Sequence, residues 1–250
     1  MIIEKEIEIL DGLPIIYIKK LSAIVCSDLH LGYEGVAAER GTFLPKTNLR
    51  HIMKILKEAK NRTNANAIII TGDIKNDFSK FHLEELNEYL ELVNYLKNML
   101  NINDIRIIKG NHDNFLDSVS VKNNNIRIYG SEVKFDDFLF MHGAALPKEK
   151  TARFIIMGHI HPSIMLITDM GKKEKLQCFL FSKKNGKNNL IVLPALSYFA
   201  EGLSVNIEHV QAVAPIFKDL FDINETKALC IGENETLDFG KIGKLKNILQ

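Results

Sequence analysis

The stretch SAIVCSDLH, residues 22–30, begins as a short apolar run and ends in an acid and a histidine. The same order returns in AIIITGD (67–73) and in IRIIKGNHD (105–113), where residues that favour β-structure again lead into a polar cluster. Apolar runs of about four to eight residues with this composition are typical of buried strands. We therefore predict three buried strands, each followed directly by polar side chains.

Helical periodicity fills the two intervals between these strands. Apolar residues there recur at the spacing that turns one face of a helix toward a core. The residues that follow this spacing are Leu49, Ile52, Met53 and Leu56 in the first interval, and Leu83, Leu86, Leu90, Val93 and Leu96 in the second. The alternation of strands and helices predicts parallel strands joined by right-handed crossovers.

The second half of the chain has a different pattern, with short strands and tight connections. Hairpins are expected at both ends of the chain, one turning at Asp11-Gly12 and one within 226–240 turning at 232–234. The remaining strands are expected at 126–128, 132–135, 138–141, 154–157, 163–168, 175–182 and 190–193. These elements predict an α+β sandwich with α/β-like character and helices on the outer faces of its sheets. Because no linker or repeat interrupts the sequence, we expect a single domain over residues 1–250.

The composition is that of a folded globular protein, with 46% apolar and 25% charged residues. A total of 32 Lys and Arg residues against 31 Asp and Glu residues gives a net charge of +1. This balance gives no overall basic field of the kind that marks many nucleic-acid-binding proteins, although a local basic patch would still be compatible with it.

The cysteines and the N-terminus indicate where the protein is found. Cys26, Cys178 and Cys230 are far apart and form no CxxC pair, which argues against a disulfide framework or a zinc ribbon. The N-terminal MIIEKEIEIL alternates charges where a signal peptide needs an apolar core. We therefore expect a cytoplasmic protein without a membrane partner.

Acids, amides and imidazoles are concentrated at the ends of the predicted strands. In chain order the clusters are Asp28-Leu29-His30, Gly72-Asp73, Gly110-Asn111-His112-Asp113, His142-Gly143 and Gly158-His159-Ile160-His161. Sites in open α/β sheets form at the carboxyl ends of strands, which is where these clusters fall. In an extended chain, residues i and i+2 point the same way, so an Asp-x-His or His-x-His triplet can send two side chains toward one point.

Each cluster has an ordinary explanation when it is taken alone. An Asp-x-His triplet is usually a turn acid beside a surface histidine, and Gly-Asp after a strand is usually a turn. The occurrence of all the clusters in one chain, each at a strand end, favours a metal site instead.

Seven side chains in these clusters are candidate metal ligands: Asp28, His30, Asp73, Asn111, His142, His159 and His161. Carboxylate, imidazole and amide oxygen without thiolate suit divalent ions such as Mn²⁺, Fe²⁺, Zn²⁺ or Co²⁺. This number of donors is too large for one tetrahedral ion and is natural for two ions about 3.5–4 Å apart that share a carboxylate. The sequence therefore predicts a site for two divalent cations.

The ordered series Asp-x-His, Gly-Asp, Gly-Asn-His-Asp, His-Gly, Gly-His-x-His resembles the calcineurin-like metallophosphoesterase superfamily. Its motifs extend here from residue 28 to residue 161. The resemblance implies a four-layer sandwich of two mixed β-sheets flanked by α-helices. SDLHLGYEGVAAERGTFLP (27–45) and LPALSYFAEGLSVN (193–206) further resemble a small archaeal branch related to the double-strand-break repair nucleases and the DNA-ligase-associated phosphoesterases.

The resemblance divides the candidate ligands between two cations that share Asp73. It places Asp28, His30, Asp73 and His161 on the first cation, and Asp73, Asn111, His142 and His159 on the second. Mn²⁺ is the expected cation, and Fe²⁺, Zn²⁺, Co²⁺, Ni²⁺ and Mg²⁺ are the alternatives.

The resemblance also implies catalytic roles for His112 and Asp113. In the family pattern a metal-bridging hydroxide attacks phosphorus, His112 protonates the departing oxygen, and Asp113 orients or tunes the ring of His112. The implied activity is that of a two-metal-dependent phosphoesterase, first of all a phosphodiesterase acting on nucleotides or nucleic acid.

Two differences from related proteins restrict which kind of phosphoesterase the sequence predicts. Protein Ser/Thr phosphatases carry an Asp-Arg-Gly continuation after Gly-Asp, whereas this chain has GDIKND (72–77), which argues against a phosphoprotein phosphatase. The repair nucleases commonly place a histidine three residues after the bridging Asp, where this chain has Asn76. Two alternatives stay open: a nuclease subunit working with an ATPase partner, and a non-catalytic interaction scaffold. The sequence does not assign the substrate-binding residues, a protein partner or the oligomeric state.

Overall fold

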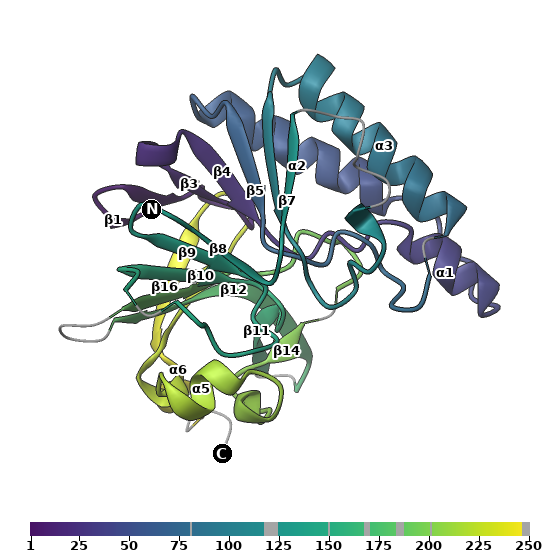
Figure 1. Cartoon of the computed structure of the whole chain (residues 1–250). Coiled ribbons are helices and arrows are strands. Elements are labelled where there is room, and N and C mark those ends of the chain that lie inside the picture. The colour runs from purple at the N-terminus through teal and green to yellow at the C-terminus, as the bar shows by residue number, and fades with distance from the viewer. Residues whose placement is uncertain are drawn as a thin grey trace.

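Two mixed β-sheets lie face to face, with helices on the outer side of each (Figure 1). The structure is a computed structural model, and it describes residues 1–80, 82–117, 125–149, 151–167, 171–183, 188–200 and 202–246. The predicted α+β sandwich with helices on its outer faces is confirmed.

The first sheet contains the three strands that the opening sequence pattern predicts. Its strands, in spatial order, are β1 (Ile2–Glu4), β2 (Ile7–Ile9), β3 (Ile16–Ile18), β4 (Ala23–Cys26), β5 (Ala67–Ile70), β6 (Asp104–Ile108) and β7 (Ile126–Tyr129). β1 to β4 are paired antiparallel, and β4 to β7 are paired parallel. The N-terminal hairpin between β2 and β3 is also as predicted, with the backbone N–H of Leu10 bonded to Ile15 O at 3.0 Å.

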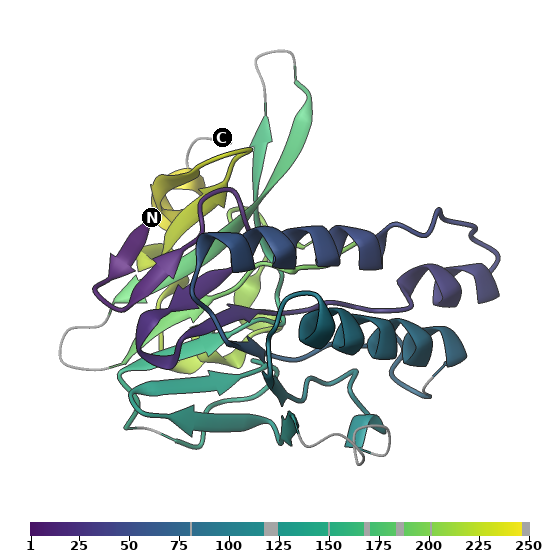
Figure 2. The ribbon, with the colours of Figure 1, turned by 90° about the horizontal axis from the view of Figure 1, so that it is seen from above.

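Three helices accompany the first sheet: α1 (Tyr33–Glu39), α2 (Asn48–Arg62) and α3 (Leu83–Asn98). Figure 2 shows the two long helices, α2 and α3, lying alongside each other. The stripe predicted for α3 is partly wrong, because Leu83 and Leu90 are 80% and 45% exposed. The buried face instead follows Tyr89, Leu92 with Val93, and Leu96, which lie three to four residues apart on the side that meets the sheet.

The second sheet is built from the later strands. Its main path, in spatial order, is β14 (Leu203–Ser204), β11 (Pro162–Ile167), β12 (Lys173–Lys183), β13 (Asn189–Val192), β10 (Phe154–Met157), β9 (Phe138–Met141) and β8 (Glu132–Phe135). The C-terminal hairpin of β15 (Lys227–Ile231) and β16 (Thr236–Lys241) pairs with β12, so this predicted hairpin is confirmed too. Residue 168, the last of one predicted strand, lies outside the described residues.

Short helical elements cover the outer face of the second sheet. They are the helices α5 (Pro215–Asp219) and α6 (Ile242–Leu245) and the 3₁₀ turns η2 (Val210–Ala212) and η3 (Ile223–Glu225), while a further turn, η1 (Lys19–Leu21), follows β3. Side chains of α5 and α6 pack against one face of the sheet in a single hydrophobic cluster.

Alternation along the strands separates three hydrophobic layers. In β5, Ile68 and Ile70 face α2 and α3, whereas Ile69 faces the second sheet. In β10, Ile156 faces the first sheet and Ile155 faces α5 and α6. Alternate residues of a strand point to opposite faces, so two sheets with both faces buried produce this four-layer arrangement. The four-layer sandwich that the resemblance implies is therefore confirmed.

Backbone contacts connect the two sheets where their strands end. Ser27, just after β4, forms a parallel bridge with Ala195, which follows β13. Between the sheets, the backbone N–H of Ser197 donates to Asp28 O at 3.1 Å, and within the first sheet that of Asp28 donates to Gly72 O at 3.1 Å. The carboxyl ends of strands from both sheets therefore meet at one edge of the sandwich.

Glu88 of α3 lies beside the start of α1, and its pKa is raised to about 7. Burial is the main cause of the raised pKa, and the nearby carboxylates of Glu34 and Glu84 add to it. The Oε2 atom of Glu88 accepts a hydrogen bond from the backbone N–H of Gly32 at 2.7 Å, which acts in the opposite direction on the pKa without offsetting burial. The carboxyl group therefore keeps its proton in the folded protein at pH values where the unfolded chain has lost it.

Glu88→Gln is expected to stabilise the protein at pH 8.5 and to have little effect at pH 4.5. Because the pKa of Glu88 is raised in the folded state, the folding free energy becomes less favourable as the pH rises from the ordinary value of 4.5 through about 7. Glutamine has no charge to bury and keeps a carbonyl oxygen for Gly32. Since Glu88 is only partly buried, we expect a gain of about 1 kcal/mol, or roughly 2–4 °C in melting temperature.

Thermal unfolding at the two pH values measures this effect. Glu91→Gln is the matched control, because Glu91 is an exposed glutamate on the same helix and should give no pH-dependent gain. A gain for Glu88→Gln that is equal at pH 4.5 and 8.5 would contradict the assignment.

Candidate metal centre

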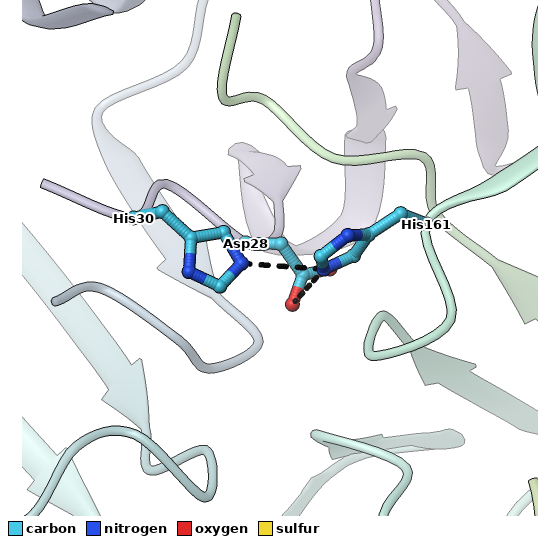
Figure 3. A group of neighbouring side chains, drawn as sticks. All are labelled: Asp28, His30 and His161. Carbon is cyan, nitrogen blue, oxygen red and sulfur yellow. Dashed lines mark hydrogen bonds and ion pairs between the residues drawn. The ribbon is translucent and has the colours of Figure 1, made fainter. Parts of the chain in front are cut away.

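The first group of candidate ligands comes from the loops after β4 and β10. Nε2 of His30 lies 3.3 Å from Nε2 of His161, and Nε2 of His161 lies 3.4 Å from Oδ1 of Asp28. Figure 3 shows the two imidazoles approaching each other from opposite sides, with the Asp28 carboxylate between them. The structure therefore brings together three residues that are up to 133 positions apart in the sequence (161 − 28).

The second group comes from the loops after β5, β6, β9 and β10. Nε2 of His142 is its centre, and it lies 3.3 Å from Oδ2 of Asp73 and 2.8 Å from Oδ1 of Asn111. Nδ1 of His159 lies 3.1 Å from the same His142 nitrogen.

Asp73 and Asp28 connect the two groups. Donor atoms of His30, Asp73 and His112 lie within 4.8 Å of one another, and so do those of Asp28, Asp73 and His142. All seven candidate ligands therefore belong to one continuous cluster, and Asp73 has partners in both groups.

The spacing of the donor atoms fits bound cations. Ligands held about 2.1 Å from one divalent ion lie roughly 3.0–3.4 Å from each other, depending on the coordination geometry. The separations of 3.1–3.4 Å in the two groups correspond to this spacing, and the His142–Asn111 pair at 2.8 Å is slightly closer. Two imidazole nitrogens that face each other cannot both donate a proton, and a cation between them would satisfy both lone pairs. The residues present thus fit a metal centre.

Backbone carbonyls fix which imidazole nitrogen faces the cluster. Nδ1 of His142 donates to Thr71 O at 3.1 Å, and Nε2 of His159 donates to Val213 O at 3.2 Å. The other nitrogen of each ring is left for the centre. Outer partners of this kind set the tautomer and orientation of metal-binding histidines.

The backbone is left-handed at most of the candidate ligands. Among the described residues nine that are not glycine have a positive φ, and five of these are Asp28 (55°), His30 (46°), Asp73 (48°), His159 (75°) and His161 (44°). The expectation that the i, i+2 pairs converge through extended chain is therefore wrong, because both members of each pair have turned out of the extended region. Each such residue costs about 1 to 3 kcal/mol, and strain of this kind is typically concentrated at functional sites.

Two glycines allow the loops to approach this closely. A Cβ atom at Gly110 would overlap the carboxylate of Asp73, and one at Gly158 would overlap the side chains of Ser27 and Asp28. Glycine at these positions is required by the close approach of the neighbouring loops.

Charges within the cluster shift its pKa values in opposite directions. Burial would raise the pKa of Asp28, but the imidazoles of His161, His142 and His30 lower it well below the ordinary value. Burial opposes protonation of His142, yet its hydrogen bond to Asp73 and the charge of Asp28 raise its pKa to about 9. Burial and the neighbouring His161 lower the pKa of His30 to about 4. Because metal ligation requires neutral imidazole, cation binding near pH 7 would release the proton of His142.

His112 lies at the edge of the cluster. Its Nδ1 donates to the carbonyl of Asn76 at 2.5 Å, and its Nε2 lies 3.6 Å from Oδ2 of Asp73. Its backbone N–H donates to Oδ1 of Asp73 at 3.0 Å. The ring is thus held with Nε2 toward the candidate ligands.

Asp113 has a different set of partners from the one expected for it. Its carboxylate is buried and accepts hydrogen bonds from the backbone N–H groups of Ile74, Lys75 and Gly110 at 2.9, 3.3 and 2.9 Å. Burial raises its pKa to about 6. The ring of His112 is bonded to the Asn76 carbonyl, which therefore orients it, while Asp113 joins the loop after β5 to the loop after β6.

Sequence reasoning did not identify Asn48 as a residue that supports the site. Its Nδ2 donates to the carbonyls of Leu29 and His30 at 3.0 and 3.1 Å, and its Oδ1 accepts from the backbone N–H of Tyr198 at 2.9 Å. An asparagine at the start of a helical pattern is usually only a helix boundary, so its sequence position carried no signal of this role.

A cavity of about 200 Å³ adjoins the second group. Its wall includes Lys109, Asn111, Ser131, His142, Leu146 and Lys148. The cavity therefore offers room for a substituent of a small molecule whose polar centre lies at Asn111 and His142.

The chain belongs to the calcineurin-like phosphoesterase family, a class of metal-dependent hydrolases of phosphoric esters. A model of this family matches residues 21–163, which include all seven candidate ligands, His112 and Asp113. The predicted family membership is confirmed.

One solved structure similar to this chain is the crystal structure of Pseudomonas putida nuclease MPE. The TM-score is 0.60 at 18% sequence identity, and the match covers 91% of this chain and 93% of that chain. At this level of identity the two proteins share a fold. No curated protein matches the chain.

In the described part of the chain, none of the helices combines the length and the apolar character needed to cross a membrane.

Proposed function

We propose that this protein is a two-metal phosphodiesterase that hydrolyses nucleotide or nucleic-acid diesters. The observation that carries the proposal is the convergence of seven donor side chains, at the spacing of metal ligands, beside a histidine held with one ring nitrogen toward them. In this proposal Asp28, His30, Asp73 and His161 hold one cation, and Asp73, Asn111, His142 and His159 hold the other. His112 is the general acid, and Asp113 positions the loop that carries it.

The two cations, when bound, supply a nucleophilic hydroxide near neutral pH and neutralise charge on the phosphoryl oxygens. His112 acts on the side of phosphorus opposite to the attacking nucleophile. Its Nδ1 proton stays with the Asn76 carbonyl, and its Nε2 proton goes to the oxygen of the departing group as the P–O bond breaks. Asp113 positions both loops, because it accepts backbone hydrogen bonds from each.

Several finer features belong to the same proposal. We take Mn²⁺ as the cation, the cytoplasm as the location and residues 1–250 as one domain. We also place the chain in the small archaeal branch related to the double-strand-break repair nucleases and the DNA-ligase-associated phosphoesterases. The complete donor set supports an active enzyme over a non-catalytic scaffold, since loss of donors would be expected in a scaffold.

The test is metal analysis together with turnover of bis-p-nitrophenyl phosphate by the purified protein. We expect two Mn²⁺ per chain after equilibration with the metal, and Mn²⁺-dependent release of nitrophenol from the diester at a higher rate than from p-nitrophenyl phosphate. Protein that binds no Mn²⁺ and cleaves neither ester would refute the proposal. Bound metal without turnover on nucleotides, DNA or RNA would favour the scaffold, and DNA cleavage only with an added ATPase would favour the nuclease subunit.

A further inference from the structure

Phe78 places an exposed aromatic ring directly beside His112. The ring centroids of the two side chains are 3.5 Å apart with an interplanar angle of 33°, so one side of the phenyl ring covers the imidazole. The side chain is nevertheless 54% exposed. A large apolar surface next to a polar reaction centre is therefore left open to solvent.

The loop that carries Phe78 is held in place by its own hydrogen bonds. Oδ1 of Asp77 accepts from the backbone N–H and the hydroxyl of Ser79, both at 2.7 Å. Nζ of the buried Lys75 donates to the carbonyl of Asp77. The carbonyl of Phe78 itself accepts from Nδ2 of Asn114 at 3.0 Å. The exposed ring is therefore presented by a fixed turn, which lowers the conformational cost of binding a ligand against it.

The position of His112 defines which part of a substrate meets this ring. In the proposed function, Nε2 of His112 gives its proton to the departing oxygen, so the departing group must lie on the His112 side of phosphorus. Phe78 covers one face of the His112 ring, and the rest of its phenyl surface is open to solvent beside that ring. A planar group attached through the sugar to the departing oxygen would meet the exposed part of the phenyl ring.

We infer that Phe78 is a stacking site for the base of the departing nucleoside, an inference that rests on the proposed phosphodiesterase function. A phenyl ring offers a π-face and no hydrogen-bonding group, so it would bind any nucleobase with little sequence preference. Stacking of one base on an aromatic side chain is worth roughly a 5- to 150-fold change in affinity. The structure thus assigns a substrate class to this side of the centre: nucleoside-bearing diesters in preference to diesters with small aliphatic departing groups.

The experiment compares three dinucleotides that share one phosphodiester linkage: TpT, and two analogues in which one or the other thymidine is replaced by an abasic tetrahydrofuran residue. The products show which sugar departs. For the wild-type protein with Mn²⁺, we expect kcat/KM to fall roughly 5- to 150-fold when the departing residue lacks its base, and to fall less when the retained residue lacks it.

Phe78→Ala should remove this preference for a base on the departing residue, and Phe78→Trp should keep it. Phe43→Ala is the matched control, because Phe43 is 85% exposed on another loop and should leave the preference unchanged. Each preference is a ratio of two substrates on one preparation, so partial loss of folded protein cancels.

Equal cleavage of the three dinucleotides by the wild-type protein, or a preference that survives Phe78→Ala, would overturn the inference and leave the phosphodiesterase standing. Cleavage of bis-p-nitrophenyl phosphate without cleavage of TpT would have the same consequence. Failure to cleave any diester would refute the proposed function and the inference with it.

Discussion

Asp73→Asn is expected to abolish the binding of two Mn²⁺ ions and to lower kcat/KM on phosphodiesters by roughly 10³-fold or more. Donor atoms of Asp73 lie within 4.8 Å of those of Asp28 and His30 in the first group and of His142 in the second. Asparagine keeps one oxygen but loses the negative charge and one of the two carboxylate donors, so it cannot bridge two cations. Metal analysis after equilibration with Mn²⁺ and turnover of bis-p-nitrophenyl phosphate measure the two effects.

Asparagine is chosen because it removes the charge of residue 73 and still tolerates the backbone conformation found there. Asp73 has a φ of 48°, and asparagine is one of the few side chains that accept this left-handed region readily. Asp136→Asn provides the control, because Asp136 has a φ of 51° but lies at the surface, 3.7 Å from Lys20. If Asp73→Asn bound two Mn²⁺ and turned over at the wild-type rate, Asp73 could not be the shared ligand.

His112→Ala is expected to reduce kcat about 10²- to 10⁴-fold on a dinucleotide while leaving the Mn²⁺ content unchanged. A sugar alkoxide is a poor departing group and needs the proton of Nε2. Nitrophenolate departs readily as an anion, so the same substitution should have a much smaller effect on bis-p-nitrophenyl phosphate. Comparison of kcat on the two substrates, with metal analysis of the same samples, tests the assignment of the general acid.

His209→Ala serves as the control for His112→Ala, because His209 is an exposed histidine to which no chemistry is assigned. Loss of Mn²⁺ in His112→Ala would show that His112 is a metal ligand and not the general acid. This outcome has to be tested because the donor atom of His112 lies within 4.8 Å of those of His30 and Asp73. Equal losses on the two substrates would likewise argue against proton transfer to the departing oxygen.

The parts of the fold that the sequence predicts are those with a strong apolar pattern, either a continuous apolar run or a helical repeat. β4 and β5 are uninterrupted runs of buried apolar residues, and β6 departs from this only at Asp104 and Arg106. Runs of this kind between helical patterns leave few other solutions. The short elements α1, β14, α5 and α6 were not predicted. The helices α1, α5 and α6 have four to seven residues, too few to show helical periodicity, and β14 has only two. Packing against the rest of the molecule determines these elements.

The candidate site was likewise predictable only in part. Its residue types were visible, because acids, amides and imidazoles at strand ends are chemically unusual wherever they occur. The partner of His112 could not be predicted, since the backbone carbonyl of Asn76 has no sequence signal. Phe78 was missed for a related reason: a lone phenylalanine in a loop gives no indication that it will lie on a histidine 34 positions later (112 − 78).

The left-handed backbone at Asp28, His30, Asp73, His159 and His161 has a consequence for protein engineering. Glycine adopts such angles without steric penalty, so it would relieve strain at each of these positions. A substitution to glycine at any of these positions would lower the local backbone strain and remove a side chain that the chemistry requires. Thermostable variants of this protein should therefore be selected for turnover as well as for heat resistance, because at these five residues the side chains needed for activity require a strained backbone.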